Sequence, residues 1–510
     1  MWNRSLLLLY LLCAVGFAAC KSEPQENGEA MPNIILILSE DHGQDLGCYG
    51  NPEVLTPNID FLAKNGVKFQ NAYTTYSVCS PSRSSIFTGL YPHQNGQIGL
   101  ATHSFRMYKT FETIPSYLKN AGYRTGCLGK IHVNPQAAIP FDYHEINASN
   151  FAKEELPQYA VKAMEFIKKD KSPFFLMVNF PDAHFPLQRQ VEGMPKNPIN
   201  ADSVSSTLPF VAADTRRLRE VTADYYNSIN RLDEAIGFLL DSLENNNLME
   251  NALIIFLSDH GAQFSRGKTT NYEAGLKTPL IIKWKGKIME GETVKDKLVS
   301  TIDLFPTIVE AVGKGNTAAP LPGRSLLSLA KGKEGDPWRE HVFAGGMEGT
   351  ALYFFPRRSV RGKQFKLIHN LLAGKEDPYY TVYTDHVYPT VISGTTEEEI
   401  LQLDQNIQNV YHTWKNPPEF ELYDLINDPW ELKNLADDKD FQVELEKMKK
   451  VLADWQEETR DPLGEVLYLD SLTNEIALVN KNYPNHGYQK IPGFKWNYPE
   501  YFGEYVWKED

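Results

Sequence analysis

Four short, strongly apolar runs constrain the fold of this chain more than any other feature of its sequence. They are NIILIL (33–38), FFLMVNF (174–180), LIIFLS (253–258) and PLIIKW (279–284). Runs without polar alternation are typical of strands buried on both faces, as in parallel sheets. Stretches with helical periodicity lie between and after them, at 57–65, 114–121, 156–169, 216–244 and 302–312. This alternation predicts an open α/β sheet with helices on both faces.

The pattern changes after about residue 340. The segments SVRGKQFKLIHNL (359–371) and FELYDLINDPWELKNLADD (420–438) predict a small sheet, followed by a helix over 441–457. The last stretch, from residue 487, is rich in Tyr, Trp and Gly and has no clear period, which favours irregular chain. We therefore expect a larger catalytic α/β domain over 32–340 and a smaller domain over 341–510 with an irregular tail.

The N-terminus is typical of a targeting segment. Arg4 supplies a positive charge, and the apolar run over 6–19 is too short to span a bilayer comfortably. Small residues precede Cys20 where apolar sequence becomes polar, which predicts a lipoprotein signal peptide over 1–20 and a flexible tether over 21–31. An ordinary signal peptide with an incidental cysteine is the alternative. We expect an exported bacterial lipoprotein, periplasmic or associated with the outer membrane, held by a lipid anchor on Cys20.

Charge and cysteine count narrow the class of protein further. A formal net charge of −14 argues against general nucleic-acid binding, although a local basic pocket can still take an anionic small substrate. In the exported chain Cys48, Cys79 and Cys127 remain, so at least one is unpaired or modified. A disulfide between Cys48 and Cys127 is one possibility.

Acidic residues follow two of the apolar runs. Glu40 and Asp41 come after the first run, and Asp259 and His260 come after the third. Ligands of open α/β sheets bind beyond the carboxyl ends of the strands, where these side chains would meet. Each acid alone could cap the following turn or helix. Both pairs together predict a site for a hard divalent cation, which would relieve their mutual repulsion.

Basic and imidazole side chains are expected at the same edge of the sheet. The second run is followed by Asp182 and His184, and GKIH places Lys130 and His132 on one side of an extended segment. Lys268 lies in a glycine-containing loop. Singly, each is more often a surface or structural residue. Together they predict a cationic, proton-handling pocket around an anion.

The run CSPSR places Cys79 just before a predicted helix, with Arg83 one turn later. Free N–H groups and the helix dipole favour anions there. Cys79 could be a buried structural cysteine or a thiol nucleophile of low pKa. The third interpretation fits best, because CSPSR resembles the Cys-x-Pro-x-Arg signature of the type I sulfatases. GKIH, YEAG and LYDLINDPWELKNLADD also resemble that family, and the likeness covers about residues 33–463.

The resemblance implies an alkaline-phosphatase-like sulfatase fold, with a large mixed sheet flanked by helices and a smaller C-terminal α+β domain. In the family the cysteine is oxidised to formylglycine, whose hydrate offers one hydroxyl to attack sulfur and a second whose collapse releases sulfate. The implied metal ligands are Glu40, Asp41, Cys79, Asp259 and His260, around Ca²⁺ or Mg²⁺. The implied catalytic residues are Cys79, Arg83, Lys130, His132, His184 and Lys268, with His184 as first choice for the acid. A sulfatase-maturing enzyme is an implied partner.

Within the family the chain most resembles the heparan N-sulfatases, through CSPSRSSIFTGLYPHQNGQIGL, GKIHV with PFDY, FPRRSVRGKQFKLIHNL and LADWQEETRDP. That resemblance implies a sulfated glycosaminoglycan substrate, cleaved at the N-sulfate of glucosamine. The chain departs from the family at Glu40, where Asp is usual, at His260, where Asn is usual, and at Lys268, where these enzymes tend to carry Arg.

Three other functions stay open. They are an O-sulfatase acting on a glycosaminoglycan or another sulfated glycan, a metal-dependent phosphatase or phosphonate hydrolase of the same superfold, and a non-catalytic glycan-binding lipoprotein. The basic residues Arg357, Arg358, Arg361 and Lys363 are expected either to reach over the pocket to a second acidic group or to form a solvated face.

Overall fold

The four apolar runs form neighbouring strands of one large mixed sheet. The computed structural model describes residues 31–508 except 148–152, 154–155, 334–336, 348 and 386–392. In this part of the chain nine strands follow the order β4-β3-β5-β1-β6-β8-β2-β7, with β9 paired to β2. They are β1 (Asn33–Ser39), β2 (Val67–Tyr73), β3 (Arg124–Leu128), β4 (Tyr143–Glu145), β5 (Phe174–Asn179), β6 (Ala252–Ser258), β7 (Lys277–Thr278), β8 (Leu280–Lys283) and β9 (Glu292–Ser300). β1 is parallel to β5 and β6, and β8 runs antiparallel to β6.

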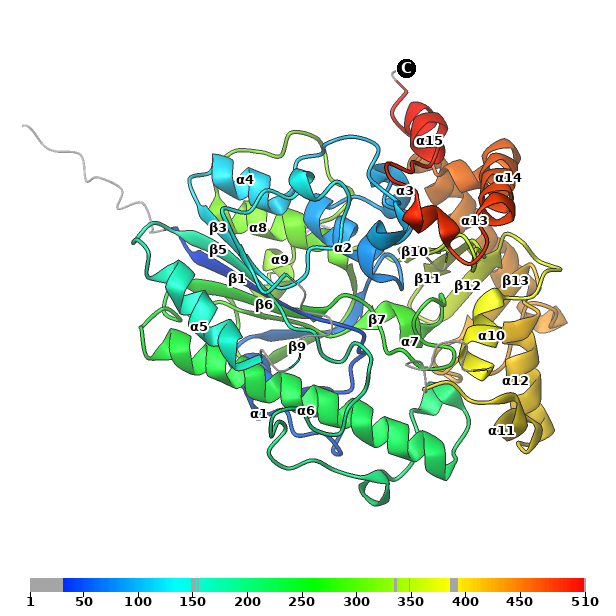
Figure 1. The fold of residues 1–510 in the computed structure, drawn as a ribbon, viewed down its shortest axis with the longest axis horizontal. Coiled ribbons are helices and arrows are strands. Elements are labelled where there is room, and N and C mark those ends of the chain that lie inside the picture. The colour runs from blue at the N-terminus through cyan, green and yellow to red at the C-terminus, as the bar shows by residue number, and fades with distance from the viewer. Residues whose placement is uncertain are drawn as a thin grey trace, which may run out of the picture. The chain divides into compact units, whose positions relative to one another are not determined.

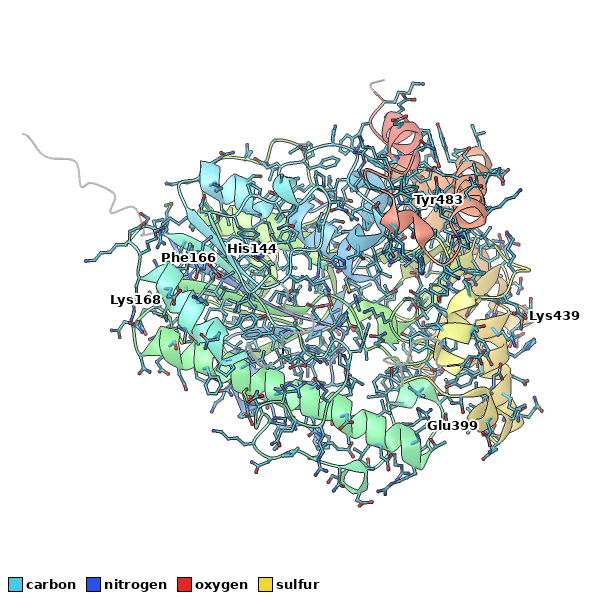
Figure 2. All side chains as sticks on the ribbon, viewed as in Figure 1. His144, Phe166, Lys168, Glu399, Lys439 and Tyr483 are labelled. Atoms are coloured by element: carbon cyan, nitrogen blue, oxygen red, sulfur yellow. The ribbon has the colours of Figure 1, made fainter. Side chains whose placement is uncertain are left out.

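Helices cover both faces of this sheet (Figure 1). On one face lie α1 (Pro57–Lys64), α5 (Leu156–Ile167) and α6 (Arg216–Glu244), and on the other α2 (Cys79–Thr88), α4 (Ile114–Asn120) and α8 (Leu304–Val312). Amphipathic spacing explains the packing: on α5, Phe166 is buried in the core while Lys168, just beyond its end, is exposed (Figure 2). The predicted α/β architecture is confirmed.

A second, antiparallel sheet follows in the order β10-β11-β12-β13. Its strands are β10 (Val342–Gly346), β11 (Arg357–Arg361), β12 (Phe365–Asn370) and β13 (Phe420–Asp424), and α13 (Gln442–Glu458) packs on it. The small sheet and its helix match the sequence prediction. The expectation of an irregular tail from residue 487 is wrong for its last part, because α15 (Tyr498–Val506) is helical; the segment before this tail forms α14 (Val466–Asn482). In α15, Tyr498 and Phe502 lie one turn apart and are buried, a pattern that the density of aromatic residues concealed.

The remaining helices are short. They are α3 (Pro92–Asn95), α7 (Glu273–Leu276), α9 (Leu327–Ala330), α10 (Pro378–Thr384), α11 (Glu397–Leu401) and α12 (Gln405–Lys415). Within the described part of the chain, no helix has the length and apolar character needed to cross a membrane. Cys20 and the predicted signal peptide lie outside the described residues. Cys48 and Cys127 are free thiols, so the disulfide considered between them is not formed.

Candidate active site

The register of the large sheet explains why the two acidic pairs meet. Ser39 at the end of β1 lies opposite Ser258 at the end of β6, so the residues that follow leave the sheet side by side. The backbone N–H of Asp41 donates to Oδ1 of Asp259 at 3.2 Å, and the side chains of both residues are buried. Asp41 itself has a left-handed backbone, with φ 52°, which turns the chain back at this edge.

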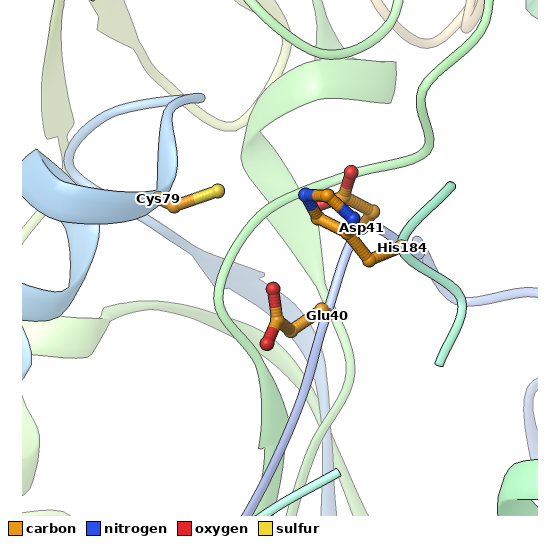
Figure 3. A group of neighbouring side chains, drawn as sticks. All are labelled: Glu40, Asp41, Cys79 and His184. Atoms are coloured by element: carbon orange, nitrogen blue, oxygen red, sulfur yellow. The ribbon is translucent and has the colours of Figure 1, made fainter. Parts of the chain in front are cut away.

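Possible metal-ligand atoms converge here in two overlapping groups (Figure 3). In each group the atoms lie within 4.8 Å of one another. One group is Glu40, Asp41, Cys79 and His184, and the other is Asp41, Cys79, Asp259 and His260. Oδ1 of Asp41 is buried, accepts no hydrogen bond from the described residues, and lies 3.4 Å from Nε2 of His260, so both atoms could bind one cation. A donor set dominated by carboxylate oxygens fits a hard divalent ion. The structure thus brings together all five predicted metal ligands and adds His184 to them.

Buried cations hold Glu40 and Asp259 in place. Lys130 Nζ lies 2.7 Å from Oε2 of Glu40, and Arg83 lies 3.0 Å from Oδ2 of Asp259 and 3.4 Å from Oε1 of Glu40. Burial by itself would raise the pKa of Glu40, but the charges of Lys130 and Arg83 lower it below its ordinary value. Burial likewise opposes ionisation of Asp259, yet His260 and Arg83 bring its pKa to about 2. Both side chains are therefore carboxylates at neutral pH.

Asp41 is paired with Lys268, whose Nζ lies 2.5 Å from Oδ2. Burial would raise the pKa of Asp41, but the charge of Lys268 lowers it strongly. Conversely, burial would lower the pKa of Lys268, and the Asp41 carboxylate raises it instead. Lys268 therefore remains an ammonium at the floor of the site.

A tight turn delivers Lys130 and His132. Gly129 has φ 97°, and a Cβ at this position would lie 2.3 Å from the carbonyl oxygen of Asn179, so only glycine fits. Asn179 in turn donates to Oε1 of Glu40 at 2.9 Å. Both ring nitrogens of His132 are buried and have no hydrogen-bond partner in the described part of the chain, and burial holds its pKa well below the ordinary value. His132 is therefore a neutral ring with polar atoms available to a ligand.

Cys79 is the first residue of α2, whereas the sequence analysis placed it just before the helix, and its Sγ lies 3.3 Å from Nε2 of His260. Burial alone would raise the pKa of the thiol, but the charges of Lys130, Lys268 and His260 lower it to about 7. The sulfur faces the acidic cluster (Figure 3). The thiol thus lies where the family signature places the modified residue.

His184 is held by a loop that a buried ionic cluster anchors. Its Nδ1 lies 2.9 Å from the carbonyl oxygen of Phe185, which can only accept, so Nδ1 carries a proton. Burial lowers the pKa of His184, and the neutral ring then presents an unprotonated Nε2. In that state Nε2 can accept a proton but has none to donate. The predicted role as acid therefore requires that Nε2 is protonated first.

Asp182 does not line the site, although its position beside His184 suggested that it would. It forms a bidentate ion pair with Arg231, at 2.7 and 2.8 Å, and lies 3.1 Å from Lys153 Nζ. Lys153 also donates to the carbonyl oxygen of His184 at 2.5 Å. Sequence reasoning missed Lys153 and Arg231, because long-range ion pairs leave no local pattern.

A cavity of about 410 Å³ opens above these groups. Cys79, His132, His184 and Lys268 lie at its lining together with residues that carry no sequence signal: His103, Thr350, Tyr353, Tyr379, Val382 and Tyr383. The segment between β10 and β11 and helix α10 thus form one wall. His103 Nδ1 lies 2.7 Å from the hydroxyl of Tyr488, so the C-terminal tail also fixes the rim.

The basic segment of the smaller sheet does not reach this cavity. Arg358 forms a buried bidentate pair with Asp461 at 2.5 and 2.7 Å, and Arg357 pairs with Asp377 at 2.5 Å. Arg361 lines a different crevice. Neither expected alternative, reach over the pocket or a solvated face, holds for Arg357 and Arg358, because Asp377 and Asp461 neutralise them in the interior. Lys363 is exposed, as the solvated alternative expects.

A mixed sheet with acidic residues at the ends of its central strands, facing a buried cysteine at a helix start, is the arrangement of an alkaline-phosphatase-like fold. Comparison with protein-family models narrows this class. The Sulfatase model matches residues 32–314, and the model "N-sulphoglucosamine sulphohydrolase, C-terminal" matches residues 264–410. The chain belongs to the sulfatase family, and it is an enzyme that hydrolyses sulfate esters or sulfamates.

Characterised relatives cover nearly the whole chain. Human N-sulphoglucosamine sulphohydrolase is 31% identical, over 89% of this chain and 93% of its own. An ulvan-active sulfatase of Formosa agariphila is 29% identical, over 94% of this chain and 84% of its own. A solved enzyme in complex with D-glucosamine-2-N,6-O-disulfate has a TM-score of 0.61 at 20% identity, covering 84% of this chain and 98% of its own. The phosphonate monoester hydrolase of Agrobacterium radiobacter has a TM-score of 0.64 at 19% identity, covering 84% and 96%, so the fold alone does not separate the two chemistries.

Proposed function

We propose that this sulfatase removes the N-sulfate group of glucosamine at the end of heparin or heparan sulfate fragments. The observation that carries the proposal is the 31% identity to human N-sulphoglucosamine sulphohydrolase across 93% of that enzyme, including its C-terminal region. The cavity of about 410 Å³ supports it, since that space suits one sugar ring bearing charged substituents rather than a polymer strand.

The residues at the cavity can bind a sulfuryl group and manage its charge. Formylglycine at Cys79 would supply the nucleophilic oxygen, and a divalent ion at the acidic cluster would polarise the sulfuryl oxygens. The ammonium groups of Lys130 and Lys268 already converge on this point and stabilise negative charge that grows on those oxygens. His132 and His184 are neutral rings at the cavity wall, suited to orient the sulfate and to exchange a proton with the departing amine.

Four further expectations belong to the proposal. The resident ion is Ca²⁺, with Mg²⁺ as the alternative, because carboxylate oxygens dominate the ligand set. A sulfatase-maturing enzyme converts Cys79. Cys20 carries a lipid anchor and becomes the N-terminal residue after removal of residues 1–19. The protein is exported to the periplasm or the outer membrane, where fragments of a polysaccharide would reach it.

The metal assignment predicts that Asp41→Ala and Asp259→Ala each lose the bound ion. Each substitution removes a ligand oxygen and an ion pair: Asp41→Ala removes the pair with Lys268, and Asp259→Ala removes the nearer of the two carboxylates beside Arg83. Metal analysis of the purified variants measures the loss. Asp45→Ala is the matched control, because Asp45 lies four residues beyond Asp41 and outside both ligand groups. Full occupancy in both ligand variants would contradict the assignment.

The substrate assignment predicts release of free amine and sulfate from N-sulfoglucosamine, and no sulfate from glucosamine-6-sulfate or from 2-O-sulfated uronate disaccharides. The measurement is sulfate and amine release by the purified, matured enzyme on each compound. Sulfate release from O-sulfated sugars alone would replace the proposal with the runner-up, an O-sulfatase. Lys268 favours that runner-up, because it lacks the forked geometry of the arginine usual in heparan N-sulfatases.

A further inference from the structure

We propose that a second crevice, separate from the cavity over Cys79, binds an acidic saccharide unit, meaning a sugar that carries a carboxylate or a sulfate group. The crevice has a volume of about 290 Å³ and is lined by residues that include Asp45, Tyr49, Gln70, Lys277, Arg361 and Trp430. It shares no lining residue with the cavity over Cys79. The choice of a saccharide among organic anions rests on the proposed function.

Two cationic groups in the crevice have unused hydrogen-bonding capacity. Lys277 is partly buried, and its ammonium forms no hydrogen bond or ion pair with the residues that the structure describes. Nε of Arg361 is buried and has no hydrogen-bond partner among the described residues; it lies 3.8 Å from Oε2 of Glu273, while Nη1 donates to the carbonyl oxygen of Gly362. Desolvated donors without acceptors are costly, so an anion placed between these two side chains would be stabilised by both.

No carboxylate among the described residues lies within ion-pair distance of the Lys277 ammonium, although the charge of Glu273, which also lines the crevice, acts on Lys277. Glu273 lies 3.2 Å from Lys366 Nζ and accepts from the hydroxyl of Tyr73 at 2.8 Å. Asp45 accepts from the hydroxyl of Tyr225 at 2.8 Å, and burial raises its pKa to about 6. The carboxyl oxygens of Asp45 can accept a hydrogen bond from a sugar hydroxyl. Burial lowers the pKa of Lys277, and an anionic substituent bound beside it would favour its charged form.

The rest of the lining suits a sugar ring more than a free inorganic anion. Trp430 is 40% exposed and borders the crevice, and an indole face can pack on the C–H face of a sugar. The side-chain amide of Gln70 makes no hydrogen bond with described residues and can bind a hydroxyl group. An aromatic surface with a few convergent polar groups is the usual composition of a small-ligand site.

The test uses a heparin hexasaccharide in which every glucosamine is N-acetylated, so that no sulfamate is present to be hydrolysed. Isothermal titration calorimetry measures its binding to the full chain and to Lys277→Met and Trp430→Ala. We expect each substitution to weaken binding at this site about tenfold, while Lys277→Arg retains it. Turnover of a monosaccharide substrate should be unchanged in all three variants. The matched control is Lys285→Met, which removes an exposed lysine paired with Glu250.

Three results would overturn the proposal. The first is wild-type affinity in both Lys277→Met and Trp430→Ala, and the second is an equal loss in Lys285→Met, which would mean non-specific charge attraction. Inorganic sulfate is titrated in parallel, and binding of sulfate as tight as that of the hexasaccharide would overturn the saccharide assignment. Circular dichroism confirms folding of each variant. The binding readout is independent of sulfamate hydrolysis, so failure of the proposed function and failure of this site are distinguishable.

Discussion

Cys79→Ala is expected to abolish turnover, with a fall in kcat of at least about 10³-fold, while the fold stays intact. The reason is that the family chemistry needs an oxygen nucleophile at this carbon, and alanine cannot be converted to formylglycine. The side chain of Cys79 lies among Lys130, Lys268 and His260, and their positive charges act directly on the atom attached to its Cβ. Steady-state sulfate release and circular dichroism measure the two halves of the prediction.

The matched control is Cys48→Ala. Burial raises the pKa of Cys48 to about 12, so it is an unreactive thiol away from the site, and its loss should leave activity unchanged. Mass spectrometry of the wild-type peptide that contains Cys79 completes the test, because conversion replaces the thiol with an aldehyde. Wild-type activity in Cys79→Ala, or an intact thiol in fully active protein from the native host, would refute the mechanism.

The sequence could predict the fold because its strongest signals are local. The strand β1 and the helix α6 were expected within one residue of their observed bounds, since an uninterrupted apolar run and a long amphipathic period leave few alternatives. The meeting of the acidic residues at the strand ends was also predictable, because parallel pairing of neighbouring strands brings Asp41 and Asp259 to one edge of the sheet, independently of the loop conformations.

Features that depend on distant pairing were not predictable. The arginines of β11 form a basic stretch in the sequence, yet Arg357 and Arg358 are neutralised by Asp377 and Asp461, which lie 20 and 103 residues away. The same holds for Lys153, which anchors the loop of His184 through Asp182. The sequence did not predict the tyrosines that line the cavity, Tyr353 and Tyr383, because they follow no regular spacing. They lie over Cys79 only once the second sheet is packed beside the first.

The second large expected effect is a loss of stability when the ion pair between Arg358 and Asp461 is broken. Asp461→Asn is expected to lower the free energy of unfolding by about 3–5 kcal/mol, because it leaves the Arg358 guanidinium buried without its carboxylate. Asp461 also caps the turn at Leu463 and ties β11 to the segment after α13, so the loss falls on the C-terminal part. Asp454→Asn is the matched control: its exposed pair with Lys450 should contribute less than about 1 kcal/mol.

The same pair should make unfolding dependent on acid. Burial would raise the pKa of Asp461, but Arg358 and His93 hold it well below its ordinary value. A group whose folded pKa is depressed contributes stability above its unfolded pKa of about 4, and that contribution is lost as pH falls toward the folded pKa. Below about pH 4 the free energy of unfolding should therefore fall more steeply with pH in the wild-type chain than in Asp461→Asn. The difference between the two slopes should correspond to the uptake of up to one proton. Urea unfolding followed by circular dichroism between about pH 7 and 3 measures both the loss of stability at neutral pH and its dependence on pH, because Asp461 takes up its proton within that range on unfolding. Equal midpoints at neutral pH and parallel pH profiles in the two proteins would show that the pair contributes nothing to stability.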